Sequence, residues 1–200
     1  IRRHVTERLA PMVAAGDGDA VTQLADPIPA VVICGLLGLP ATDAELIVPH
    51  VLAVGELLDG LADHAGMTRA GTAAIELAGY AATKLDEQRA RPTGDRSPLM
   101  EGLVAGIDAD EITADEAVGM LVQLFTAGTE TTQSLTATAI DQLARDPQRQ
   151  QALRADPASI PADLEAILRD DGPFQFHYRW APSDTRLGDT AVPAGSRVLL

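Results

Sequence analysis

The sequence predicts a mainly α-helical protein with a small antiparallel β-sheet towards its carboxyl end. Before Gly172, apolar residues recur at helical spacing in several segments, beginning with residues 1–14. A proline-free stretch from Thr113 to Arg145 is long enough for one helix of roughly 33 residues, or roughly 50 Å. After Gly172-Pro173 the pattern changes to strict alternation of aromatic and polar residues, which is typical of a strand.

The composition indicates a globular protein and argues against several classes of partner. Of the 200 residues, 46% are apolar and 22% are charged, and the net charge is −14. So acidic a surface repels nucleic acids and anionic membranes. The longest apolar run, residues 28–39, is shorter than the roughly 20 residues of a membrane-spanning helix. No secretory signal opens the chain, and the single cysteine fits a reducing compartment. We therefore expect a soluble, cytoplasmic protein.

Shorter helices are predicted on both sides of the long one. Residues 20–39 should form a short strand or turn and then an apolar helix, and Thr42 or Asp43 is a suitable N-cap for the helix that follows. The predicted ranges of the remaining helices are 41–61, 68–91, 100–104, 147–155 and a helix opening at 159–161.

The long helix has well-defined ends. Thr113 and Glu116 have the spacing of a capping box, and Asp146-Pro147 ends the helix. Residues 117–125 are apolar nearly all round, which predicts burial on all sides.

The predicted strand carries four of the six aromatic residues of the chain. Its aromatic face is Phe174, Phe176, Tyr178 and Trp180, and His177 lies on the polar face with Gln175 and Arg179. Turns are predicted at 187–189 and 192–195, and the sequence ends inside a strand pattern at 197–200. We expect one domain over residues 1–200 that is part of a longer protein, because a last strand left open is rare.

A polar break interrupts the long helix at residues 126–133, where Gly128, Glu130 and four threonines follow an apolar run. Glycine costs about 1 kcal/mol relative to alanine inside a helix, and threonine hydroxyls can bond back to the preceding turn. From spacing alone, a close helix crossing and a functional site explain this break equally well.

The segment Ala127-Gly128-Thr129-Glu130-Thr131-Thr132 resembles the I-helix motif of cytochrome P450 enzymes. Four other segments are similar to segments of that family: 32–40 (the E helix), 146–148 with 153–161 (the J helix and the residues after it), 179–184 (the strand after the K helix) and 193–195 (the next turn). The resemblance covers nearly the whole chain. It implies a partial P450 fold, helices D to K and the following strands, without the N-terminal helices and the C-terminal cysteine-ligand loop.

The resemblance implies roles for six residues. Ala127 and Gly128 would leave room for dioxygen over a haem b, Thr131 would hold a hydrogen bond there, and Glu130 would relay protons from solvent. Arg179 would hold a haem propionate, and His177 could assist it from the same face of the strand. The alternative for the last two residues is a solvated strand face.

Two features depart from the family pattern. The K helix of P450 enzymes carries Glu-x-x-Arg, and here Ala166 stands three residues before Arg169, with Glu165 as a possible substitute. The axial cysteine is also absent from the sequence, because Cys34 lies in an apolar run with no nearby basic residue and is expected to be a core residue.

The leading hypothesis from the sequence is a fragment of a bacterial-type haem monooxygenase that is inactive by itself. By family resemblance, the whole enzyme would insert one oxygen atom from O2 into a small organic substrate, with electrons from a ferredoxin-type donor. Residues 46–91 would cover the substrate. One alternative is a haem-less P450-like protein that activates a glycosyltransferase, which the missing glutamate favours. A helical scaffold without a ligand is the third possibility.

Overall fold

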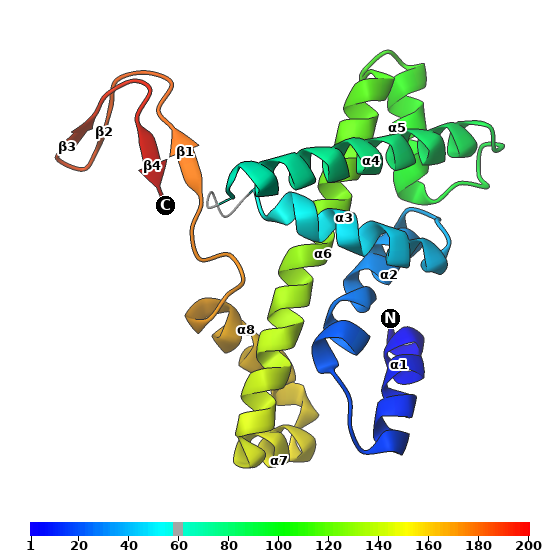
Figure 1. Ribbon diagram of the computed structural model, residues 1–200, viewed down its shortest axis with the longest axis vertical. Coiled ribbons are helices and arrows are strands. Elements are labelled where there is room, and N and C mark those ends of the chain that lie inside the picture. The colour runs from blue at the N-terminus through cyan, green and yellow to red at the C-terminus, as the bar shows by residue number, and fades with distance from the viewer. Residues whose placement is uncertain (58–61) are drawn as a thin grey trace.

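The computed structural model describes residues 1–57 and 62–200, and it is mainly helical. Figure 1 shows one long helix, α6 (Ala114–Arg145), running through the molecule, with the other helices arranged around it. Helices α3 (Ala44–Gly55) and α4 (His64–Arg89) cross its first half, and α2 (Pro27–Leu36) packs against its middle. The small antiparallel strands follow at the carboxyl end, so the predicted fold class is confirmed.

The other elements complete this frame. They are α1 (Arg2–Ala15), a π-helical turn (Val21–Ala25), a 3-10 turn (Ala41–Asp43), α5 (Pro98–Asp108), α7 (Pro147–Ala155), a second 3-10 turn (Pro157–Ser159) and α8 (Ile160–Asp170). The first part of the 20–39 segment is therefore a helical turn and not a strand.

Two predicted helix ends differ from the structure. Helix α3 ends at Gly55, and the residues predicted to complete it, 58–61, lie outside the described part of the chain. Helix α4 begins at His64 and not at Thr68, because the Asp63 carboxylate accepts the backbone N–H of Gly66 at 2.7 Å and caps the helix there.

The start of α6 is the predicted capping box. The Thr113 hydroxyl accepts the backbone N–H of Glu116 at 3.2 Å, and the Glu116 carboxylate accepts the backbone N–H of Thr113 at 2.7 Å. The hydrogen bonds from Thr113 lower the pKa of Glu116, because they favour its charged form.

Only one face of the first half of α6 is buried. Ala117, Leu121 and Phe125 are fully buried against the core, whereas Met120 is 44% exposed and Leu124 is 36% exposed. The predicted burial is therefore confirmed for one face of this segment and not for the second, which no described element covers.

The core lies where α2, α3, α4 and α6 meet, and it contains Cys34. Burial raises the pKa of the Cys34 thiol to about 11, so this cysteine is a core residue, as expected. Asp43 makes no capping hydrogen bond. Its carboxylate instead accepts the Tyr80 hydroxyl at 2.7 Å, which ties the start of α3 to α4. Burial and this bond raise the pKa of Tyr80.

The strands form two separate antiparallel pairs. The first pair is β1 (Tyr178–Trp180) with β4 (Arg197–Leu199), and the second is β2 (Thr185–Leu187) with β3 (Thr190–Val192). The strand predicted from residue 174 is shorter, because backbone pairing with the chain beyond Ser196 starts only at His177, opposite Leu200. The alternation of the sequence marks the faces of the strand but not its length.

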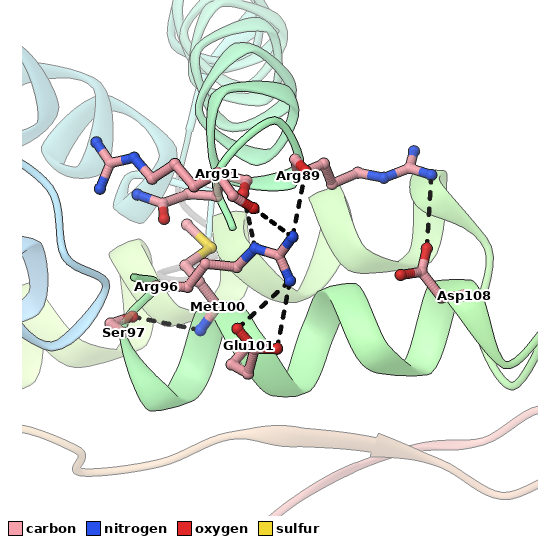
Figure 2. A network of polar contacts seen from close by, with 8 residues as sticks. Arg89, Arg91, Arg96, Ser97, Met100, Glu101 and Asp108 are labelled. Carbon is pink, nitrogen blue, oxygen red and sulfur yellow. Dashed lines mark hydrogen bonds and ion pairs between the residues drawn. The ribbon is translucent and has the colours of Figure 1, made fainter. Parts of the chain in front are cut away.

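Arg96 joins the end of α4 to α5. Its guanidinium donates to the backbone carbonyls of Gln88 at 2.8 Å, Arg91 at 2.7 Å and Arg89 at 3.2 Å, and it pairs with the Glu101 carboxylate at 3.3 Å. Figure 2 shows the guanidinium group of Arg96 between the end of α4 and α5. Because the last carbonyls of a helix lack partners within the helix, a positive charge there stabilises the helix end.

Replacing Arg96 with alanine is expected to lower the free energy of unfolding by about 2–3 kcal/mol, because the side chain is only 9% exposed and its partners would be left unpaired. Urea unfolding measures the change. Arg91→Ala is the matched control: its side chain is exposed and forms no hydrogen bond or ion pair within the described ranges, so a change of at most about 0.5 kcal/mol is expected. Equal effects of the two substitutions would contradict the assignment.

Candidate functional site

The polar break of α6 places one threonine hydroxyl on the carbonyl of the residue four positions earlier. Thr131 Oγ1 donates to the Ala127 carbonyl at 2.9 Å, so both residues lie on one face of the helix. Thr126 and Thr136 bond back to Val122 and Thr132 in the same way. Such bonds bend helices slightly and fix the direction of the hydroxyl.

The face that carries Ala127 and Thr131 is the one that the described elements leave uncovered. At helical spacing it continues the line of Met120 and Leu124, and Ala127 is itself exposed. Met120, Leu124 and Ala127 thus form a row of apolar residues that the half-buried Thr131, with its oriented hydroxyl, continues. Such a row can take a flat apolar ligand and hold one hydrogen bond to it.

Gly128 does not share this face. A Cβ atom on Gly128 would lie 2.5 Å from Cδ1 of Ile33, so the missing side chain serves the close packing of α6 on α2. Gly128 thus lies on the α2 side of α6, where it also lines a groove. The close helix crossing at Gly128 and the uncovered face at Ala127 occur at neighbouring residues of α6.

Glu130 lies beside Thr131 on α6 and is half-buried. Its carboxyl group reaches the last residue of α3: a Cβ atom on Gly55 would lie 2.5 Å and 2.6 Å from the two carboxyl oxygens. Glu130 therefore lies between the buried face of α6 and the uncovered one.

The two expected residues of the strand lie elsewhere. Arg179 in β1 is exposed, and its guanidinium donates to the Tyr178 carbonyl at 3.0 Å. The ring of His177 packs on that of Phe174, with centroids 5.6 Å apart. Figure 1 shows β1 standing away from α6. The structure brings Ala127, Glu130 and Thr131 together on α6, and it places Arg179 in β1 and His177 directly before that strand.

Two apolar grooves border α6. One of about 860 Å³ lies between α1, α2 and α6, and Gly128 and Thr132 line it; the other, of about 710 Å³, lies between α5 and the first half of α6, and Met120 and Leu124 line it. Within residues 1–57 and 62–200, no three His, Cys, Asp or Glu side chains are close enough to hold a metal ion. The helices in the described part of the chain are all too short or too polar to cross a bilayer.

Comparisons with curated proteins give several relatives of one kind, although no protein-family model matches. The chain is 36% identical to cytochrome P450 144 of Mycobacterium tuberculosis over 177 residues, which are 88% of the chain and 40% of that protein. It is 30% identical to cytochrome P450 130 of the same organism over 202 residues, which cover 100% of the chain and 49% of that protein. It is 34% identical to cytochrome P450 monooxygenase PikC of Streptomyces venezuelae, over 94% of the chain and 44% of that protein.

The chain belongs to the cytochrome P450 family. It spans less than half the length of these curated relatives. Solved P450 structures agree: CYP164A2 of Mycobacterium smegmatis in its ligand-free state superposes with a TM-score of 0.83 at 32% identity, over 98% of the chain and 51% of that protein. CalO2 gives a TM-score of 0.86 at 28% identity, over 98% of the chain and 48% of that protein.

The K-helix departure of this P450 sequence is also visible in the structure. Ala166, Glu165 and Arg169 of α8 are all exposed, and the ion pairs among the described residues include none between Glu165 and Arg169. Glu165 therefore does not replace the missing glutamate in this structure.

The residues of the uncovered face suit the distal side of a haem. Ala127 adds little bulk, Met120 and Leu124 are apolar, and the Thr131 hydroxyl is held in place by the Ala127 carbonyl. Cys34 does not suit the iron ligand, because it is fully buried in the core and its thiol stays protonated. The residues of the uncovered face thus fit one side of the haem, and Cys34 does not fit as the iron ligand on the other.

Sequence reasoning missed Gly55. The residue falls inside the predicted helix 41–61, where a glycine weakens the helix and so requires a packing or functional reason. That anomaly was the only available signal, since nothing in the sequence connects residue 55 with Glu130.

Proposed function

We propose that the protein is a haem-dependent monooxygenase that inserts one oxygen atom from O2 into a small organic substrate. The observation that carries the proposal is the Thr131 hydroxyl, held on the carbonyl of the exposed Ala127 in line with Met120 and Leu124, with Glu130 as its neighbour. Membership of the P450 family and the name of the relative PikC support the same reaction class.

A bound haem would supply the binding and activation of dioxygen in this reaction. One oxygen atom enters a bond of the substrate and the other leaves as water, with the uptake of two electrons and two protons. The protons must arrive in a pocket that otherwise excludes water. Thr131 holds a hydrogen bond at the oxygen site, and Glu130 moves protons towards it from the solvent side. Ala127 leaves space for the small gas molecule.

The proposal also covers the haem propionate, the axial ligand and the electron donor. Arg179, whose guanidinium has no carboxylate partner within the described ranges, would hold a haem propionate, with His177 beside it. The axial thiolate would come from outside these 200 residues, so residues 1–200 alone should be inactive. A ferredoxin-type donor would supply the electrons, and the enzyme would work in the cytoplasm.

The test is the absorption spectrum of the complete gene product, reduced and exposed to carbon monoxide. The proposal predicts a Soret band at the position diagnostic of thiolate-ligated haem. A purified protein that holds no haem, even when it is produced with a haem precursor, would overturn the proposal.

A second candidate is a haem-less P450-like protein that activates a glycosyltransferase. The exposed Ala166 favours it, and so does the absence, among the described residues, of any ion pair of Glu165 or Arg169 that could brace this helix as the family's K helix is braced. The test is to add the purified, haem-free protein to a glycosyltransferase and to measure the turnover of that enzyme. A raised turnover would support this second function.

A further inference from the structure

Helix α3 ends against the carboxyl group of Glu130. Gly55, the last residue of α3, is buried, and a Cβ atom built on it would lie 2.5 Å and 2.6 Å from the two carboxyl oxygens and 2.7 Å from the carboxyl carbon. Real Cβ atoms essentially never approach another heavy atom within 3.0 Å. Any side chain at residue 55 would therefore displace the Glu130 carboxyl group or the end of α3.

Backbone conformation does not explain this glycine. The glycines with positive φ are Gly16, Gly38, Gly94, Gly188 and Gly195 among the described residues, and Gly55 is helical. Alanine is a better helix former than glycine at such a position. The close approach of Glu130 is thus the physical reason for a residue without a side chain.

The end of α3 has little freedom to move away. Val51, one turn earlier, is fully buried, and so are Phe125 and Thr129 on the facing part of α6. Closely packed cores resist such shifts. The Glu130 side chain is the flexible partner, so extra bulk at residue 55 acts on the position of the carboxyl group. At Gly128, by contrast, the atoms that a Cβ atom would meet belong to the apolar end of the Ile33 side chain and not to a carboxyl group.

We propose that Gly55 is a positioning residue for Glu130: the missing side chain at the end of α3 lets the Glu130 carboxyl group lie against the α3 backbone, beside Thr131. This inference rests on the proposed function, in which Glu130 relays protons. Gly55 itself touches neither haem nor substrate in this account, and it acts only through Glu130.

The first test is a double-mutant cycle on the thermal unfolding of the complete gene product. Gly55→Ala should shift the midpoint less favourably in the wild-type background than in the Glu130→Ala background, because the added methyl group displaces the carboxyl group only in the first, whereas helix propensity favours alanine in both. Gly79→Ala on α4, where a Cβ atom meets nothing within 4 Å, is the control and should not lower the midpoint in either background. Equal shifts of Gly55→Ala in both backgrounds would overturn the inference.

The second test compares product formed per electron consumed across a range of pH. Gly55→Ala should lower this ratio and change its pH profile as Glu130→Gln does, and the double variant should lose no more than Glu130→Gln alone. Glu130→Asp, which is one methylene shorter, should recover part of the ratio in the Gly55→Ala background.

The two proposals fail in different ways. If Glu130→Gln lowers the ratio and Gly55→Ala does not, the inference about Gly55 is wrong and the relay by Glu130 stands. If the stability cycle shows coupling but Glu130→Gln leaves the ratio unchanged, Gly55 does position Glu130, and the proton relay of the proposed function is wrong.

Discussion

Thr131→Ala in the complete gene product is expected to uncouple electron consumption from product formation. Removal of this hydroxyl, which is held on the Ala127 carbonyl, would take away the hydrogen bond through which protons reach the oxygen site in the proposed mechanism. General acid–base groups contribute typically 10²–10⁴-fold, so product formed per electron consumed should fall by about tenfold or more. Product yield and cofactor oxidation, measured in the same reaction, give this ratio.

Thr132→Ala is a closely matched control. It removes the same hydroxyl from the next residue of α6, but Thr132 lines the groove beside α1 and α2, on the side of Gly128. The ratio should stay within about twofold of wild type, as is usual for substitutions away from the reacting groups. Equal losses for the two variants would remove Thr131 from the mechanism.

Phe125→Ala is expected to lower the free energy of unfolding by about 3–5 kcal/mol. Phe125 is fully buried on α6, and its ring packs on that of Tyr80, with centroids 5.8 Å apart. Because this contact joins α6 to α4 inside the core, truncation leaves a cavity that neither helix can fill. Urea unfolding monitored by far-ultraviolet circular dichroism measures the loss.

Two further variants test the cause of this effect. Phe125→Leu keeps most of the volume and should lose less than half as much. Ile75→Ala removes a large apolar side chain from α4, but Ile75 is 76% exposed, so a change within about 0.5 kcal/mol is expected. A loss at Ile75 as large as that at Phe125 would show that burial does not decide the effect.

The sequence predicted those parts of the fold that depend on local chemistry. The capping box at Thr113 and Glu116 and the proline after Asp146 set both ends of α6, and the structure has the helix at Ala114–Arg145. The start of β1 at Tyr178 was not predicted well, because it depends on backbone pairing with the strand near Leu200. Contacts between distant residues leave no periodic pattern.

The site was predictable in its residue types and less so in its geometry. The motif identified Ala127, Glu130 and Thr131, and their positions on one helix follow from helical spacing. The direction of Gly128 towards Ile33 could not be read from the motif, since it depends on where α2 crosses α6. Arg179 lies in β1 and His177 directly precedes that strand, as expected. How far the two residues lie from α6 could not be predicted, because it depends on how the whole chain packs.

We propose that the face of α6 with Ala127 and Thr131 lies over the haem iron, and carbon monoxide affinity is the measurement that tests this placement. In the reduced complete gene product, Ala127→Leu should weaken binding by about fivefold or more, because added bulk at a filled site typically costs about 1–3 kcal/mol. Ala144→Leu places the same bulk on an exposed position near the end of α6 and should leave the affinity unchanged. Equal affinities for the two variants and wild type would contradict the claim.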